Sequence, residues 1–245
     1  MATRVTVRRY GRVAAVVVAA GEGRRMGTPG AKAFIPLKGV PILVHAIQPL
    51  EACGRIQSLY PVLPEQDLHS WHQKILQKFP LKKARPPVAG GLRRQDSVRL
   101  GLESIREDID IVLIHDGARP FVDASMVERL LDKMEETQAA VLAVPAKETM
   151  KIVSPYGRVL ETLAREAVWH IQTPQAFDYH IIVEAHRKAV TDGIMATDDS
   201  TLVERLGVSV TVVHGSYRNI KITTPEDLII ARALLENRRR SASES

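Results

Sequence analysis

The chain has 245 residues, of which 45% are hydrophobic and 25% charged, so a disordered or collagen-like chain is excluded, and the 4% of aromatic residues are too few for a platform that stacks single-stranded nucleic acid. Lys and Arg number 34 against 28 Asp and Glu, and the net charge of +6 favours polyanionic partners. The single cysteine, Cys53, excludes an internal disulfide and a cysteine-based zinc site, and is typical of a cytoplasmic protein.

The first predicted element is a buried strand at residues 13–20. Four arginines precede this apolar run, much as a charged segment precedes the hydrophobic region of a secretory signal: Arg4, Arg8, Arg9 and Arg12. The run is short, however, and charged residues stand where a cleavage site would lie, so we predict a strand and not a signal sequence. Elsewhere no apolar stretch approaches the roughly 18 residues that a membrane span needs.

Short runs of Val, Ile and Leu then alternate with stretches of helical periodicity, a rhythm typical of repeated βαβ units. The predicted strands span residues 13–20, 58–63, 109–115, 139–144 and 208–214, and the predicted helices span residues 41–51, 65–79, 94–105, 124–137 and 179–191. Pro61 is unfavourable in a central strand because it lacks a backbone donor, and Pro86 and Pro87 make residues 84–89 a short or irregular strand. The predicted fold class is α/β and Rossmann-like, a mostly parallel sheet with helices on both faces.

Residues 147–163 interrupt this rhythm, because they have no helical apolar face. The segment Ser154-Pro155-Tyr156-Gly157 fits a type I turn, so we predict a protruding β-hairpin arm at about residues 145–170. An isolated two-stranded ribbon is only marginally stable in water. We therefore expect the arm to serve in dimerisation, packing on a second subunit; the alternative is an arm folded back on its own domain.

Near the end of the chain, Thr224-Pro225-Glu226-Asp227 has the residues that begin a helix, which we expect to continue to about Asn237. Residues 238–245 have no apolar anchor and predict a disordered basic tail. We thus expect a single domain, residues 1–237, which includes the arm.

The strongest functional pattern follows the first strand: Ala19-Ala20-Gly21-Glu22-Gly23-Arg24-Arg25, with Lys32 close behind. A glycine-rich turn at the carboxyl end of a parallel strand lets backbone N–H groups approach a phosphate. The spacing is neither that of a P-loop nor that of the dinucleotide fingerprint. The added cations would offset the charge of a nucleoside triphosphate and a phosphomonoester, which indicates nucleotidyl transfer. The alternative is an ordinary turn with solvated arginines.

Further polar groups lie near the ends of predicted strands, where open α/β sheets place their ligands. Gly90-Gly91 precedes a helix start, and His115-Asp116-Gly117-Ala118-Arg119-Pro120 offers a carboxylate for Mg²⁺ or ribose and an arginine for a phosphate. Thr197-Asp198-Asp199-Ser200 fits either a polyol contact or a plain helix cap. In Asn219-Ile220-Lys221-Ile222, the lysine must reach outward to solvent or inward to a charge.

Together these fragments resemble the 2-C-methyl-D-erythritol 4-phosphate cytidylyltransferase family, whose motifs occur here in the same order and at similar spacing over most of the chain. The matching residues are Ala19-Ala20-Gly21, Gly23, Arg25-Met26, Gly90-Gly91, Arg94, Ser97, His115-Asp116, Arg119-Pro120, Thr149-Met150-Lys151, Thr173-Pro174-Gln175, Thr197-Asp198-Asp199 and Asn219-Ile220-Lys221-Ile222-Thr223. Each fragment is weak alone, but the ordered set is highly specific. Ala31 stands where the family usually has proline.

The resemblance implies a nucleotidyltransferase fold and a homodimeric, Mg²⁺-dependent enzyme that joins CTP to methylerythritol phosphate and releases pyrophosphate, with no nucleic-acid or membrane partner. The positions implied for CTP are Ala19, Ala20, Gly21, Gly23, Gly91, Arg94, Ser97 and Asp116, of which Asp116 also lies in the metal region. Those implied for the sugar phosphate are Arg119, Thr149 and Thr197, and those implied for catalysis are Arg25, Lys32, Arg165 and Lys221. By the same resemblance, Thr149 and Arg165 reach the site of the partner subunit.

The phosphate of such an acceptor is already an anion near neutral pH, so in-line attack on the α-phosphorus needs neither a covalent nucleophile nor a strong general base. We therefore predict that His115 is a strand-end residue hydrogen-bonded to backbone. Three other interpretations stay open: another acceptor such as ribitol 5-phosphate, a catalytically silent nucleotide-binding regulator, and nucleic-acid binding through Arg238-Arg239-Arg240.

Overall fold

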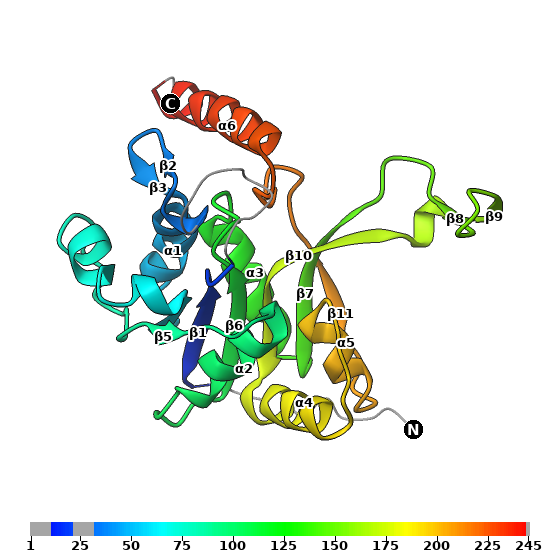
Figure 1. Ribbon diagram of the computed structural model, residues 1–245, viewed down its shortest axis with the longest axis horizontal. Helices are drawn as coiled ribbons and strands as arrows, with labels where there is room; N and C mark the ends of the chain where they lie inside the picture. Colours follow the sequence, from blue (N-terminus) through cyan, green and yellow to red (C-terminus); the bar gives the residue numbers. More distant parts are fainter. Residues whose placement is uncertain (1–10, 22–31, 244–245) are drawn as a thin grey trace.

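A computed structural model describes residues 11–21 and 32–243 of the chain (Figure 1). Its centre is a seven-stranded sheet in the order β11-β7-β10-β6-β1-β4-β5. The strands are β1 (Val13–Val18), β4 (Ile56–Leu63), β5 (Val88–Ala89), β6 (Ile111–Asp116), β7 (Ala139–Pro145), β10 (Trp169–Asp178) and β11 (Thr211–His214). β10 runs antiparallel to both of its neighbours, β6 and β7, and every other pair in the sheet is parallel. The predicted mostly parallel α/β fold is confirmed.

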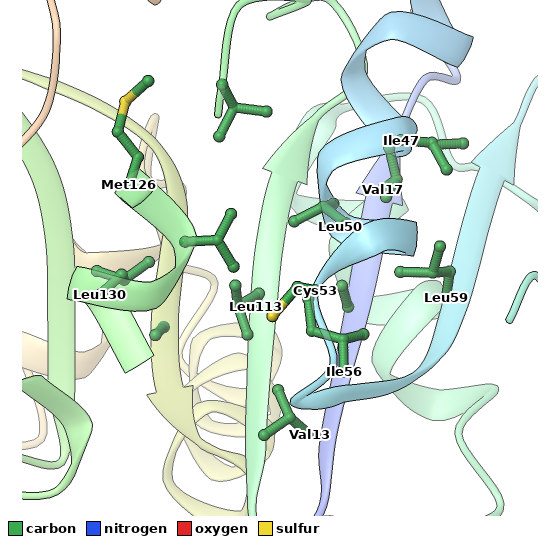
Figure 2. Close-up of a cluster of buried hydrophobic side chains, with 14 of the residues drawn as sticks. Val13, Val17, Ile47, Leu50, Cys53, Ile56, Leu59, Leu113, Met126 and Leu130 are labelled. Atoms are coloured by element: carbon green, nitrogen blue, oxygen red, sulfur yellow. The ribbon is translucent and has the colours of Figure 1, made fainter. Parts of the chain in front are cut away.

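Helices cover both faces of the sheet. Because successive side chains of a strand point to opposite faces, β1 sends Val13 and Val17 into one apolar cluster and Val16 into another, all three nearly without exposure. Helices α1 (Ile42–Ala52) and α3 (Ala124–Met134) pack on the first face; Figure 2 shows Val17 beside Leu50 of α1. Helices α2 (Arg94–Glu103), α4 (Tyr179–Thr191) and α5 (Asp199–Glu204) pack on the second.

Local sequence explains where these helices begin. The Asp123 carboxylate accepts a bond from the backbone N–H of Met126, and that of Asp178 accepts bonds from the N–H groups of His180 and Ile181, so each aspartate caps a helix whose first donors lack helical partners. At the far end of the chain, α6 (Pro225–Ser243) packs over the small hairpin of β2 (Pro36–Leu37) and β3 (Val40–Pro41) (Figure 1). This helix runs past the end expected near Asn237.

Strand β10 was not predicted. It lies between β6 and β7 and is largely buried, yet its buried side chains include Gln172, Thr173 and Gln175, which do not form an apolar run. They are tolerated because they are hydrogen-bonded: Gln172 donates to Ser216 O at 2.8 Å, and Gln175 donates to an oxygen of Asp198 at 2.6 Å. The pairing with β7 is irregular between Ile171 and Gln175.

The predicted single helix at residues 65–79 was wrong. The segment forms two short helices instead, a 3-10 helix at Glu65–Asp67 and a π-helix at His72–Leu76. Trp71 and Ile75 still bury their side chains, so the apolar spacing was read correctly. The backbone bonds of Asp67, Leu68 and Trp71 reach back three residues, and so they do not build an α-helix.

Pro61 lies inside β4 after all. Leu59 and Leu63, which flank it at two residues on either side, bond toward the β5 side, where Leu59 N donates to Lys83 O at 2.9 Å and Gly90 N donates to Leu63 O at 2.8 Å. Because alternate residues of a strand bond to the same side, the nitrogen of Pro61 faces the segment that precedes β5. In that segment Pro86 and Pro87 form no strand pairing with β4. The proline therefore interrupts no pairing between named strands.

The predicted hairpin is present as β8 (Lys151–Val153) and β9 (Val159–Thr162), which pair antiparallel at the end of an arm that extends away from the sheet (Figure 1). Every residue of the two strands is exposed, so the arm is not folded back on its own domain. Among the described helices, none is both long and apolar enough to cross a membrane.

Candidate active site

Two cavities open at the carboxyl edge of the parallel strands, the edge at which this kind of sheet binds ligands. The larger has a volume of about 710 Å³, and its wall includes Gly21 and Lys32. The smaller has a volume of about 490 Å³, and its wall includes Arg119 and Thr197. Among the described residues, three side chains line both cavities: Arg94, Asp116 and Lys221. The junction of the two cavities is thus built from charged groups.

Asp116, the last residue of β6, is the centre of this junction, and its side chain is only 7% exposed. Arg94 Nε donates to Asp116 Oδ1 at 2.8 Å, and Lys221 Nζ donates to Asp116 Oδ2 at 2.7 Å. Burial alone would raise the pKa of Asp116, but the charges of Arg94 and Lys221 outweigh it and hold that pKa far below its usual range. The carboxylate is therefore ionised near neutral pH.

Arg94, at the start of α2, bridges two carboxylates. Its Nη1 donates to Asp199 Oδ2 at 2.7 Å, opposite the bond from Nε to Asp116. Burial acts to lower the pKa of Arg94, but the two carboxylates raise it above its ordinary value, so the guanidinium stays charged. Its Nη2 is buried without a hydrogen-bond partner among the described residues.

The wall of the larger cavity is made by close packing of two glycine-containing loops. A Cβ at Gly90 would overlap that of Ala20 and lie 2.9 Å from Ser97 Oγ, so this position accepts only glycine. Gly91 N donates to Ser97 Oγ at 3.1 Å, which ties the second loop to α2. Ala19 N donates to Val62 O at 2.8 Å, and the first residue after β1 is thereby fixed against β4.

The loop after β6 is tied to the segment that carries Lys221. Ile222 N donates to Ala118 O at 2.9 Å, and Arg119 Nη1 donates to Asn219 O at 2.8 Å. Lys221 therefore reaches inward to a charge, which is one of the two placements considered from sequence. The Arg119 side chain is 12% exposed, and its Nε lies 3.9 Å from Asp116 Oδ2.

His115 has the structural role predicted for it. Its Nε2 lies 3.3 Å from Arg119 O, its Nδ1 lies 3.1 Å from Thr173 Oγ1, and the residue is fully buried. Burial lowers the pKa of His115 to about 4, so the ring is neutral near pH 7. The same threonine oxygen accepts from Asp116 N at 2.9 Å, which links β10 to the junction.

The structure brings most of the predicted site residues together. The two cavities are lined by Ala19, Ala20, Gly21, Lys32, Gly91, Arg94, Ser97, Asp116, Arg119, Thr197 and Lys221. Thr149 and Arg165 are exposed on the arm and line neither cavity of their own chain; Arg165 donates to Lys147 O at 3.4 Å. Gly23 and Arg25 lie outside the described residues.

The contacts of several residues that shape the junction were not predicted from the sequence. For Asp198 and Asp199 the sequence offered a polyol contact or a helix cap, but the Asp198 side chain does not cap α5: it accepts from Gln175 and Ser200. Thr173 belonged to a quoted motif but had no assigned contact. His186 on α4 gave no signal at all, since a lone histidine in a helix carries none.

Comparison with known proteins gives a consistent result. The family model described as IspD, 2-C-methyl-D-erythritol 4-phosphate cytidylyltransferase, matches residues 13–237. A protein of that name from Syntrophus aciditrophicus is 46% identical over 225 residues, covering 92% of this chain and 96% of the relative, and one from Pelotomaculum thermopropionicum is 43% identical over 234 residues, covering 96% and 98%.

Two solved structures are similar to this chain over most of its length. The crystal structure of 4-diphosphocytidyl-2C-methyl-D-erythritol synthase from Anaerococcus prevotii superposes with a TM-score of 0.82 at 33% identity, covering 92% of this chain and 96% of that one. The crystal structure of 2-C-methyl-D-erythritol 4-phosphate cytidylyltransferase from Thermus thermophilus superposes with a TM-score of 0.73 at 31% identity, covering 90% and 98%.

Proposed function

The chain belongs to the 2-C-methyl-D-erythritol 4-phosphate cytidylyltransferase family, and we propose that it transfers the cytidylyl group of CTP to 2-C-methyl-D-erythritol 4-phosphate. The products are 4-CDP-2-C-methyl-D-erythritol and pyrophosphate, and the enzyme is a nucleotidyltransferase of isoprenoid biosynthesis. The observation that carries the proposal is the junction of two cavities at Arg94, Asp116 and Lys221. Two anionic substrates need two adjoining sites and cations between them.

CTP is assigned to the larger cavity and the acceptor to the smaller. Residues 19–21, which follow β1, line the larger cavity, and a glycine backbone there can approach phosphates closely. The smaller cavity has Arg119 for a phosphate and polar side chains such as Thr197 for hydroxyl groups. The α-phosphorus of CTP and the acceptor phosphate would then meet beside Lys221.

The chemistry requires positioning and charge more than proton transfer. An oxygen of the acceptor phosphate forms the new bond to the α-phosphorus, the bond to the oxygen bridging to the β-phosphate breaks, and pyrophosphate leaves with that electron pair. No proton has to be removed from the acceptor. Lys221 at the junction, Lys32 in the larger cavity and Arg25 are assigned to stabilise the charge that develops on the transferring group.

Mg²⁺ fits this residue set. Among the described residues, no group of three or more His, Cys, Asp or Glu side chains could hold a metal alone. Mg²⁺ is usually bound by one or two carboxylates together with substrate phosphates, and Asp116 supplies a buried carboxylate on both cavities. When bound, the ion would neutralise phosphate charge. Each Asp116 oxygen accepts from one cation, so a lone pair is left on each.

We further propose that the enzyme is a homodimer with exchanged arms. The arm presents Ile152, Val153, Val159 and Leu160, each between 44% and 63% exposed, which is unfavourable in water unless another surface covers them. Thr149 and Arg165 line neither cavity of their own chain, and so they are assigned to the partner's acceptor site. A cytoplasmic location is proposed as well, supported by the unpaired, buried Cys53.

The test is the release of pyrophosphate by purified protein supplied with CTP, Mg²⁺ and 2-C-methyl-D-erythritol 4-phosphate. We expect turnover with this acceptor, much slower turnover with ribitol 5-phosphate or with ATP, and loss of turnover when EDTA removes the metal. A rate with ribitol 5-phosphate equal to that with the methylerythritol phosphate would contradict the assigned acceptor. Nucleotide binding with no turnover on either acceptor would favour the silent regulator.

A further inference from the structure

A chain of polar contacts leads from the partly exposed junction into the buried interior of the protein. It runs from Asp116 through Arg94 to Asp199 on α5 and His186 on α4. The side chains of Asp199 and His186 are each 2% exposed, and neither lines either cavity. These two residues therefore cannot touch a substrate in the cavities, and any effect they have on the reaction must pass through Arg94.

The geometry shows what Asp199 does to Arg94. The guanidinium is held from two sides, by Asp116 Oδ1 at Nε and by Asp199 Oδ2 at Nη1, at 2.8 and 2.7 Å. The remaining oxygen of Asp199 is also engaged, because His186 Nε2 lies 3.2 Å from Oδ1. Both oxygens of Asp199 are thus fixed by groups on two other helices, and the direction of the Arg94 fork is fixed with them.

Without the Asp199 charge, Asp116 would be the carboxylate left to attract Arg94. Planar guanidinium groups prefer to bind a carboxylate through two parallel bonds, and a rotated Arg94 could take both oxygens of Asp116. The second of those oxygens now accepts from Lys221 at 2.7 Å. Arg94 and Lys221 would then compete for Asp116, and the arrangement between the two cavities would change.

The charge state of Asp199 supports this role. Burial acts to raise the pKa of Asp199, but the charge of Arg94 and the hydrogen bond from His186 lower it below its ordinary value. Asp199 is therefore an anion near neutral pH, and it pairs with Arg94 together with Asp116.

We propose that Asp199, held by His186, is a positioning residue for cytidylyl transfer: it anchors one side of Arg94 so that Arg94 and Lys221 each hold one oxygen of Asp116. This inference rests on the proposed function for its kinetic part. It assigns no substrate contact to Asp199. Its effect therefore belongs to the alignment of the junction in the transition state and not to the binding of either substrate.

The kinetic test is the variant Asp199→Asn, which keeps the size of the side chain and removes its charge. We expect kcat to fall about 10- to 100-fold, the size of effect caused by a small misplacement of groups around the reacting atoms, with KM for each substrate changed less than about threefold. The matched control is Glu103→Gln, which removes a carboxylate paired at 2.7 Å with Arg99 of the same helix α2. A kcat for Asp199→Asn equal to that of the control would overturn the proposal.

His186 supplies a second pair of variants, which decides the matter if Asp199→Asn does not fold. His186→Leu removes the donor to Asp199, whereas His186→Gln keeps a side-chain N–H group near the position of Nε2. We expect a lowered kcat in the leucine variant and recovery of most of it in the glutamine variant. Equal kcat values in both would show that the hydrogen bond is not used, and would overturn the proposal.

A spectroscopic readout separates this inference from the proposed function. The Arg94 Nη1–H group, which donates to Asp199 at 2.7 Å, can be observed by ¹⁵N NMR and assigned through its loss in Arg94→Lys. It should exchange slowly with water in the wild-type protein, and at least tenfold faster in Asp199→Asn but not in Glu103→Gln. An unchanged exchange rate in Asp199→Asn refutes the anchoring of Arg94 even if the wild-type enzyme turns over. If the wild-type protein lacks turnover but this exchange changes as expected, the proposed function fails and the anchoring stands.

Discussion

Lys221→Met is the variant that best separates catalysis from folding in this protein. Methionine keeps most of the length of the side chain and removes the charge that lies 2.7 Å from Asp116. After the substitution Asp116 keeps its bond from Arg94 at 2.8 Å, which Arg94 shares with Asp199, and Arg119 Nε lies 3.9 Å from the other Asp116 oxygen, so the buried carboxylate keeps cationic partners. The Lys221 side chain is 37% exposed, which screens its pairing, and we expect the free energy of unfolding to fall by only about 1 kcal/mol. For a chain of this size that corresponds to a decrease in Tm of about 2–4 °C.

The expected effect on turnover is much larger. Removing one preorganised charge from the transferring group should lower kcat by about 10²- to 10³-fold, which is roughly 3–4 kcal/mol in the barrier. The matched control is Lys133→Met, because Lys133 is 35% exposed, pairs with Glu136 at the same distance of 2.7 Å and lines neither cavity. It should have a similar Tm and normal turnover. The assay is pyrophosphate release beside thermal unfolding of each variant, and turnover that falls only in proportion to the unfolded fraction would refute this reasoning.

Lys32→Ala should lower kcat by about 10²-fold while the protein stays folded, and near-normal pyrophosphate release would contradict its role. In an equal mixture of Lys32→Ala and Arg165→Ala subunits, half of the dimers contain one subunit of each kind. If the arms are exchanged, one of the two sites in each mixed dimer is intact, so about a quarter of wild-type activity should return. No recovery after proven mixing of the subunits would count against exchanged arms. Burial lowers the pKa of His115 from 6.5 to about 4, so below pH 6.5 this histidine is protonated in the unfolded chain but still neutral in the folded protein. Stability should therefore drop by about 2 kcal/mol between roughly pH 7.5 and pH 5, and His115→Gln should flatten this slope in urea titrations.

Most of the fold could be predicted because its strands are apolar on both faces. Such runs identify β1, β6 and β7 directly, and helices with a clear apolar face, such as α4, were found with their ends. Strand β10 could not be found in this way, because its place in the sheet depends on hydrogen bonds from buried amides to residues far along the chain. Local patterns describe apolar burial well and describe buried polar networks poorly.

The same contrast between local patterns and long-range polar contacts explains which parts of the candidate site could be predicted. Turns at strand ends pointed to Asp116 and to the loop after β1, since topology alone brings such turns to one edge of the sheet. The hydrogen-bond partners of the site residues could not be predicted from such turns. Arg94 and Asp199 bond across 105 positions of sequence, and no spacing rule links them. The inward direction of Lys221 was likewise one of two open choices until its contact with Asp116 was seen.

The two buried carboxylates also explain how the cations can be in place before any substrate binds. A triphosphate and a phosphomonoester bring about six negative charges, and a site prepared for them would otherwise hold strongly repelling cations at low dielectric. Asp116 and Asp199 together offset this repulsion, because each accepts from Arg94, while Asp116 also pairs with Lys221 and Asp199 with His186. The guanidinium and ammonium groups are thereby held in fixed positions without a polyanion. Because these positions need not be created during the reaction, the charges can stabilise the transition state with little reorganisation, which is what electrostatic catalysis of phosphoryl transfer requires.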